Sequence, residues 1–348
     1  MARISRAVLL ALALLLAAAP TAGAGWRKID LRVESAVFYG ASCTKGLCVV
    51  VGMGADPPEG QGSAGLIAAA RRPLAGAGAW KPSDWKVTLF NDRRGYVPNF
   101  RDVSCPSPRF CLAVANKGRI YTTRHPLHGA SAWRPIAIPG LGSLRFASCV
   151  SRSLCVVLAY RGQLLVSAAP EGGAEAWRVT DVSGLAGPSD PFATPSGLDC
   201  TSRSFCAAAD NETLYVTTDP ASEAWSVSKA FQPPGPNFSA FGCASSALCL
   251  GGGFGALLST TSPSDPNGVW TETPLGEESL NAIDCPMPSF CAASLAPGEV
   301  HFSTSPATGP WVRSRRFLDR DASLRALSCE APETCVAGGR NGLIVASY

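Results

Sequence analysis

Short stretches with an alternation of apolar and polar residues recur along the chain. Residues 119–123 and 213–217 show this two-residue period, which is typical of β-strands with one buried face. Runs of small, mostly apolar residues such as 111–115 and 335–339 lie between them and fit strands of a tightly packed interior sheet. The pattern predicts an all-β chain and argues against a helical repeat.

Fourteen cysteines divide the chain into units. They form seven close pairs, the first with four intervening residues and the others with five: Cys43 and Cys48, Cys105 and Cys111, Cys149 and Cys155, Cys200 and Cys206, Cys243 and Cys249, Cys285 and Cys291, Cys329 and Cys335. Zinc sites use similar pairs but need further Cys or His nearby, and the chain has only three His. The even count and the pairing favour disulfides. We expect one bridge in each unit, joining its first two strands across a hairpin.

The spacing of these pairs indicates a repeat architecture. From one first Cys to the next, the steps are 62, 44, 51, 43, 42 and 44 residues. A period of 40–45 residues with four short strands per unit is typical of propeller blades. A tryptophan opens the fourth strand in six units: Trp85, Trp133, Trp177, Trp225, Trp270 and Trp311. We expect these rings to seal the gaps between neighbouring blades.

The two ends of the chain complement each other. The last unit stops at Tyr348, on its third strand, whereas residues 26–31 resemble a fourth strand with no blade before it. Pairing of the two would close a ring and hide two sheet edges. We therefore predict a seven-bladed β-propeller with one disulfide per blade, closed by the N-terminal strand in the last blade.

The N-terminus predicts export. Arg3 and Arg6 precede a thirteen-residue apolar run at 7–19, followed by small residues suited to signal peptidase. The run is too short for a bilayer, which needs about 20 residues. We expect a signal peptide at 1–24 and a single secreted, monomeric domain at 25–348, without a transmembrane segment; an uncleaved or lipid-linked N-terminus is the alternative.

Composition narrows the ligand classes. Charged residues are 16% of the chain, and removing Arg3 and Arg6 lowers the formal net charge from +4 to +2. This balance gives no electrostatic basis for binding nucleic acid. His125 and His128 lack a nearby carboxylate in the sequence, so a solvated loop is favoured over a metal pair. We expect no metal and no cofactor.

The units resemble the sialidase-like propeller repeats that carry the aspartate box, and the photosystem II assembly factor-like family, in the Cys-paired version of secreted bacterial proteins. The box reads Ser-x-Asp-x-Gly-x-Thr-Trp. Its nearest approach here, from Thr217 through Asp219 to Trp225, is one residue too long and lacks the Gly, and Ser303 to Trp311 lacks the Asp. The resemblance covers residues 25–348 and implies a fold, because the box is a structural turn.

A sialidase-like activity would require three arginines, a Tyr–Glu pair and an Asp acid, and no local motif singles out such a set. We therefore expect no catalytic residues and a non-catalytic binding or scaffold propeller. Its partner would be a glycan or an envelope or extracellular protein; the alternative is a sialidase-like glycoside hydrolase or lyase.

Candidate ligand-binding residues lie on the turns predicted to rim the central channel. Connections from strand four to the next strand one, and from strand two to strand three, share one face of a propeller. Aromatic, amide and arginine side chains there suit a sugar or an acidic peptide, although a solvated rim would look similar. The candidates are Arg93, Arg94, Tyr96, Asn116, Lys117, Tyr160, Arg161, Asp210 and Arg340.

Overall fold

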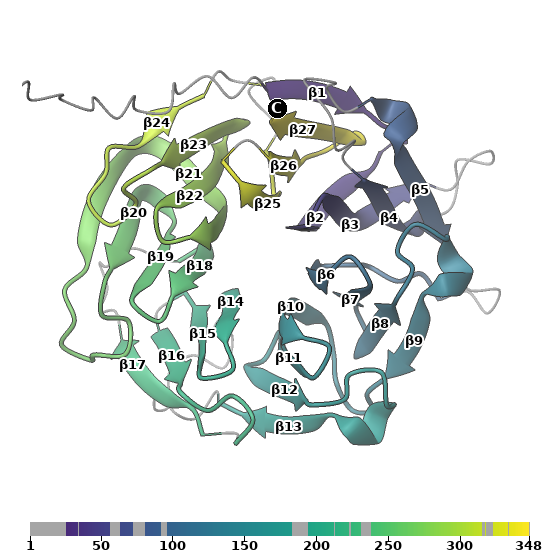
Figure 1. The fold of residues 1–348 in the computed structure, drawn as a ribbon, viewed down its shortest axis with the longest axis horizontal. Coiled ribbons are helices and arrows are strands. Elements are labelled where there is room, and N and C mark those ends of the chain that lie inside the picture. The colour runs from purple at the N-terminus through teal and green to yellow at the C-terminus, as the bar shows by residue number, and fades with distance from the viewer. Residues whose placement is uncertain are drawn as a thin grey trace, which may run out of the picture.

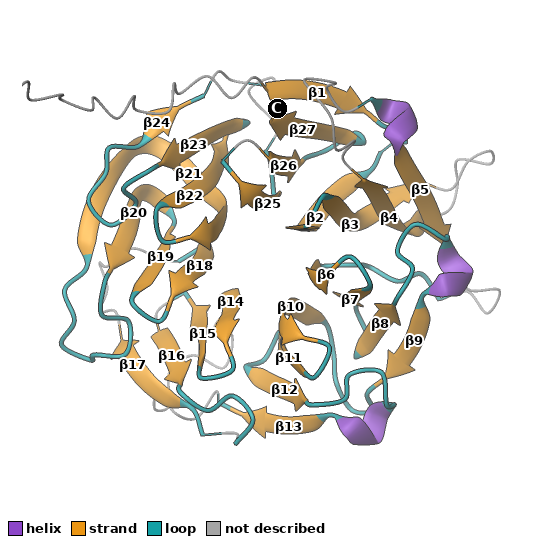
Figure 2. Ribbon diagram, in the orientation of Figure 1, coloured by secondary structure: helices purple, strands orange, loops and turns teal. Residues whose placement is uncertain are grey.

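The computed structural model shows a ring of small β-sheets around a central opening (Figure 1). Figure 2 shows that strands dominate, with three single-turn 3-10 helices, η1 (Pro82–Asp84), η2 (Ala130–Ala132) and η3 (Ala174–Ala176). No helix in the described part of the chain has the length and apolar character to cross a membrane. The structure describes residues 26–33, 35–55, 63–71, 81–91, 96–182, 194–211, 213–222, 224–230, 238–314, 317, 323–332 and 334–347.

Four of the sheets contain four antiparallel strands that are consecutive in the chain. In each sheet the first strand lies nearest the centre of the ring and the fourth lies at its outside. They are β2 (Val37–Thr44), β3 (Leu47–Ala55), β4 (Ser63–Arg71) and β5 (Trp85–Phe90); β6 (Asp102–Ser107), β7 (Phe110–Val114), β8 (Arg119–Thr123) and β9 (Arg134–Ala137); β10 (Leu144–Ser151), β11 (Leu154–Ala159), β12 (Gln163–Ser167) and β13 (Arg178–Asp181); β14 (Pro195–Ser202), β15 (Phe205–Asp210), β16 (Thr213–Thr217) and β17 (Ser226–Ala230).

One larger sheet has seven strands because β21 takes part in two units. Its first residues pair with β20, and from Ser279 onward it pairs with β22. Counting β21 twice gives two further units of four strands. The strands are β18 (Ala240–Ser245), β19 (Leu248–Gly252), β20 (Phe254–Thr260), β21 (Thr271–Met287), β22 (Phe290–Ala296), β23 (Glu299–Ser303) and β24 (Val312–Arg313).

The remaining sheet combines the two ends of the chain. Its strands are β25 (Ala326–Ala331), β26 (Thr334–Gly338), β27 (Leu343–Ser347) and β1 (Trp26–Asp30). β1 pairs antiparallel with β27, with Trp26 opposite Ser347 and Asp30 opposite Leu343. The expectation of an all-β chain built from repeated four-stranded antiparallel sheets is confirmed.

Each cysteine pair forms a disulfide across the hairpin between the first two strands of its unit, as the spacing predicts. The bridges join Cys43 with Cys48, Cys105 with Cys111, Cys149 with Cys155, Cys200 with Cys206, Cys243 with Cys249, Cys285 with Cys291, and Cys329 with Cys335. Together they use all fourteen cysteines of the chain.

The bridges lie at matched positions in the strand register. The paired Cα atoms are 3.9–4.1 Å apart, and Cys149 on β10 stands directly opposite Cys155 on β11. The second cysteine of each pair is almost completely buried: Cys48, Cys111, Cys155, Cys206, Cys249, Cys291 and Cys335 are all 0–1% exposed. Each bridge thus fastens the innermost strand of a unit to its neighbour, within the packed interior.

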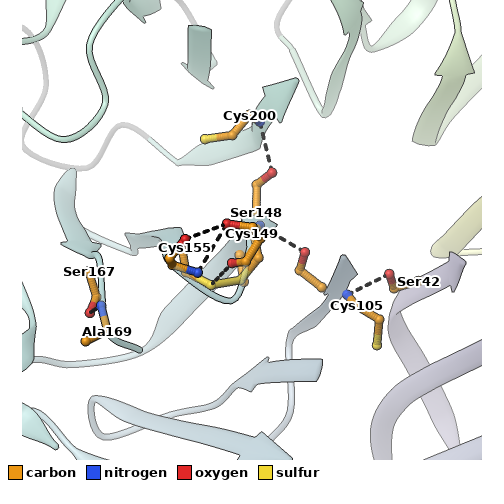
Figure 3. Close-up of a disulfide and its surroundings, with 12 residues drawn as sticks. Ser42, Cys105, Ser148, Cys149, Cys155, Ser167, Ala169 and Cys200 are labelled. Atoms are coloured by element: carbon orange, nitrogen blue, oxygen red, sulfur yellow. Dashed lines mark hydrogen bonds between the residues drawn. A yellow bond between two sulfur atoms is a disulfide. The ribbon is translucent and has the colours of Figure 1, made fainter. Parts of the chain in front are cut away.

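A second set of contacts joins the innermost strands of six units to the next unit. The residue just before the first Cys of a pair accepts a hydrogen bond from the backbone N–H of the next unit's first Cys. Figure 3 shows two of these bonds, from the Cys105 N–H to Ser42 Oγ at 2.9 Å and from the Cys200 N–H to Ser148 Oγ at 2.9 Å. The others use Ser104, Asp199, Asp284 and Ser328. Gly242 has no side chain with which to accept such a bond. We call these six bonds the inner clips.

Apolar side chains fill the spaces between neighbouring units. Seven separate buried clusters each draw residues from two adjacent units, and each contains or contacts one tryptophan. Trp177, for example, is 5% exposed and packs with Leu112 of one unit and Val157 of the next. Trp26, on β1 itself, fills the same role between the last unit and the unit before it. The core is therefore distributed around the ring, and no single centre holds it.

Candidate functional site

The innermost strands surround a cavity of about 410 Å³ at the centre of the ring. β2, β6, β10, β14, β18, β25 and the second part of β21 all contribute to its wall, and Figure 1 shows these strands around the central opening. The position four residues before the first Cys of each pair is polar in every unit, and each of these residues lines the cavity. We call this set the polar ring: Tyr39, Arg101, Arg145, Ser196, Ser239, Asn281 and Arg325.

Three members of the polar ring carry buried N–H groups with no acceptor among the described residues. These groups are Arg101 Nε, Arg145 Nε and Asn281 Nδ2. All three are donors, and the two arginines carry a permanent positive charge. Leaving such donors unpaired is costly. The wall therefore suits a ligand that supplies oxygen acceptors and negative charge.

Aromatic rings hold the two guanidinium groups in place. The Arg101 guanidinium carbon lies 4.7 Å from the centre of the Tyr39 ring, and that of Arg145 lies 5.9 Å from the centre of the Phe146 ring. These are distances at which cations contact aromatic faces. Burial, and then the charge of Arg101, lower the pKa of Arg145. The lowering reflects a positive charge in a partly desolvated site, where a bound anion would relieve the repulsion.

Three aspartates also line the cavity. Burial raises the pKa of Asp102 to about 7, of Asp199 to about 7 and of Asp284 to about 6. Asp199 and Asp284 belong to the inner clips. Asp102 accepts bonds from the backbone N–H groups of Val103 at 2.8 Å and Ala147 at 2.9 Å, one on each carboxylate oxygen. Their carboxylates therefore hold backbone across unit boundaries.

The structure brings together three of the residues predicted from the sequence. The Tyr96 hydroxyl donates to the carbonyl oxygen or the side-chain oxygen of Asn116, at 2.9 and 2.7 Å. The Lys117 ammonium lies 5.5 Å and the Arg119 guanidinium carbon 4.2 Å from the centre of the Tyr96 ring. Burial raises the pKa of Tyr96. These contacts fasten a connection between units to the β7–β8 turn.

The other predicted residues lie on separate turns. Tyr160 is 41% exposed and Arg161 is exposed, both at the β11–β12 turn. Arg340 is exposed beside β27. Asp210 accepts bonds from the Thr213 N–H at 2.7 Å and the Tyr215 hydroxyl at 3.0 Å, so it closes its own turn. Arg93 and Arg94 lie outside the described residues.

Sequence reasoning missed the polar ring, although a signal for it was present. Aligning the seven units on their first Cys places only polar residues at the fourth position before it. A ring of polar side chains at one inner-strand position is the signal that could have found the cavity wall.

Two further groups of side chains contain histidine. The His125 and His128 rings lie 5.1 Å apart between their centres, in the loop before η2. Among the described residues, one cluster has three side chains whose possible ligand atoms lie close enough together to hold a metal ion: Glu278, Glu299 and His301. This cluster lies at β21 and β23, away from the cavity wall.

Comparison with known proteins identifies the fold class. No family model matches the chain, and no curated protein matches it. Among solved structures, YCF48 from Cyanidioschyzon merolae is 14% identical with a TM-score of 0.70, covering 93% of this chain and 99% of that one. A structure described as YCF48 bound to D1 peptide is 13% identical with a TM-score of 0.67, at 92% and 96% coverage.

A catalytically inactive variant of virginiamycin B lyase from Staphylococcus aureus, determined with quinupristin, is 11% identical with a TM-score of 0.69, at 93% and 98% coverage. These proteins are β-propellers, one a peptide-binding protein and one an enzyme. Identities this low show a shared fold alone. The expectation of a propeller is confirmed.

Proposed function

We propose that this chain is a secreted, non-catalytic binding propeller that holds an acidic segment of a partner protein in its central cavity. The observation that carries the proposal is the set of unpartnered donors on Arg101, Arg145 and Asn281. A carboxylate supplies two oxygens that can accept from several such donors, and charged hydrogen bonds of this kind are strong. A volume of about 410 Å³ suits one or a few residues of an extended peptide.

A peptide is favoured over a glycan by two observations. The polar-ring groups that lack a hydrogen-bond partner among the described residues are all N–H donors. A neutral sugar presents hydroxyls, which need acceptors from the protein as well as donors. The solved structure of a similar propeller is described as bound to a peptide. The exposed turn residues Lys117, Tyr160, Arg161 and Arg340 then form an outer, mainly basic rim that an acidic partner would meet first.

The remaining features of the proposal concern export and closure. Seven disulfides suit an oxidising compartment, which supports export by a signal peptide at residues 1–24. The exported part would be a monomeric domain at 25–348. The pairing of β1 with β27 supports a seven-bladed ring closed by its N-terminal strand.

Fluorescence anisotropy with labelled acidic peptides tests the function. Each peptide is compared with its amidated, neutral counterpart. We expect the Arg101→Ala/Arg145→Ala variant to bind the acidic peptides at least tenfold more weakly, because a charged hydrogen bond contributes about 1.5–3 kcal/mol. The control is Arg27→Ala/Arg134→Ala, which removes the same charge from exposed positions on the outer strands β1 and β9.

The control variant should bind like the unmodified protein. An equal loss of peptide affinity in both double variants would show that net charge alone causes the loss. That result would reject the cavity as the binding site. If the protein binds to a glycan array and binds no acidic peptide, its partner is a sugar and the peptide proposal is wrong.

A hydrolase or lyase is the second candidate because the cavity brings together side chains that such chemistry uses. Arg101 and Arg145, the Tyr39 phenol and the Asp102 carboxyl all line it, and a carboxyl with a pKa of about 7 could donate a proton near neutral pH. Against catalysis, both Asp102 oxygens accept backbone bonds. Turnover of fluorogenic glycosides that is lost in Asp102→Asn would favour the enzyme.

A further inference from the structure

Glu278, Glu299 and His301 converge at the outer part of the sheet that contains β21. Glu299 and His301 are two residues apart on β23, so their side chains leave the same face of the strand. Glu278 lies on β21, next to Ser279, where that strand begins to pair with β22. The exposed side-chain fractions are 4% for Glu299, 12% for His301 and 15% for Glu278. Three polar side chains from two strands thus meet in a mostly buried place.

The distances within this cluster fit a bound cation better than direct hydrogen bonds. His301 Nε2 lies 3.6 Å from Glu278 Oε2 and 3.6 Å from Glu299 Oε2. Hydrogen bonds from nitrogen to oxygen are usually 2.7–3.2 Å long, so these contacts are at ion-pair distance, and this buried nitrogen makes no hydrogen bond of ordinary length among the described residues. The candidate ligand atoms all lie within 4.8 Å of one another.

An ion shared by His301 and either carboxylate would have ordinary coordination geometry. Zn²⁺ binds imidazole nitrogen and carboxylate oxygen at about 2.0–2.2 Å. Two ligand atoms 3.6 Å apart can both contact such an ion at an angle of roughly 120°, close to the tetrahedral arrangement. One imidazole and two carboxylates leave a fourth position for water.

The cluster already attracts a positive charge. The Arg313 guanidinium on β24 contacts both Glu278 and Glu299. Its side chain is 54% exposed, so it can move into solvent without opening the fold. Arg313 therefore supplies the positive charge at this place from a half-exposed side chain.

We propose that Glu278, Glu299 and His301 form a binding site for one divalent transition-metal ion, with Zn²⁺ as the best match, which Arg313 vacates when the ion binds. Mixed imidazole and carboxylate ligands favour zinc over magnesium or calcium, which prefer oxygen ligands alone. The ion would fasten β23 to β21, the strand shared by two units. The site is separate from the central cavity and does not depend on the function proposed for it.

Zinc titration of the exported, disulfide-bonded protein tests the site. The protein is first dialysed against a chelator, and binding of ZnCl₂ is followed by calorimetry. We expect one ion per chain, at least a tenfold loss of affinity in His301→Ala, and an unchanged titration in His125→Ala/His128→Ala. That control removes the other two histidines and with them adventitious zinc binding.

Two further measurements separate metal ligation from folding defects. Arg313→Ala should bind zinc more tightly than the unmodified protein, because a competing cation is gone. If His301→Ala does not fold, Glu278→Gln replaces it as the ligand-loss variant. The unmodified protein with Co²⁺ should show the intense visible absorption of a four-coordinate site. Absence of zinc binding, binding that survives loss of His301 or Glu278, or loss of binding in the control that lacks His125 and His128 would each reject the proposal.

Discussion

Gly242 marks the interruption in the inner clips, and replacing it with serine tests what these bonds contribute. The other six units have Ser or Asp at this position, and each accepts a bond from the next unit's Cys N–H. A Cβ at position 242 would have the Ile283 carbonyl oxygen as its nearest neighbour, at 3.4 Å, and Ile283 Cγ2 at 3.6 Å. These are ordinary contacts. Serine would therefore fit and could accept from the Cys285 N–H.

The expected gain has two parts. A neutral hydrogen bond contributes about 0.5–1.5 kcal/mol to stability. Removing the backbone freedom of a glycine in the unfolded chain adds about 0.4–1 kcal/mol where the native conformation tolerates a side chain. Gly242→Ser should therefore raise the free energy of unfolding by about 1–2.5 kcal/mol.

Urea unfolding with the disulfides intact measures this difference, and Gly242→Ala is the control. Alanine gains the backbone part but offers no acceptor, so the serine variant should exceed it by about 1 kcal/mol. The reverse change, Ser104→Ala, should lose about the same amount, because it removes the clip to Cys149. A serine variant no more stable than the alanine variant would show that the clip contributes nothing at this interface.

Two further predictions concern the innermost strands. Burial raises the pKa of Asp199 to about 7, so the folded protein holds a proton that the unfolded chain releases from about pH 4 upward. This contribution to stability is present below pH 4 and lost as pH rises to 7. In Asp199→Asn the unfolding free energy should fall by about 2 kcal/mol less over pH 4–7 than in the unmodified protein, which is half of what three pKa units give because cavity water screens the charge. The same pH dependence of the unfolding free energy in both proteins, measured by urea unfolding, would contradict this. Cys149→Ala/Cys155→Ala should lose about 2 kcal/mol, measured by thermal and urea unfolding, and a loss within error would mean that the hairpin is already ordered in the unfolded chain.

The repeat and its strands could be predicted because each unit repeats the same local signals. A cysteine pair marks the hairpin between the first two strands, and a tryptophan marks the fourth. The unpartnered segment at 26–31 pointed to an incomplete last unit, and β1 does lie against β27. The cysteine and tryptophan signals are encoded within about 45 residues of one another, where alternation and spacing are visible.

The site was harder to predict because its members are far apart in the chain. Arg101 and Asn281 are separated by 180 positions in the chain. They line the same cavity only once the ring has folded. Viewed singly, each is a polar residue in an inner strand or directly before one. The turn residues drew attention because exposed aromatic and basic side chains often bind ligands. Asp210 shows why that reasoning fails, since its carboxylate is used by the turn itself.

The position of the first cysteine explains how so small a unit can hold a cavity-lining side chain accurately. At Cys149 the sulfur is bonded to Cys155 within the unit, and the backbone N–H is bonded to Ser104 of the preceding unit. Arg145 lies four residues earlier on the same strand. A strand tied on both sides at one point cannot slide or tilt freely, so the side chains upstream keep their places around the cavity. Loosening a clip should therefore weaken binding at the polar ring before it unfolds the protein, because the donors would no longer converge on one ligand.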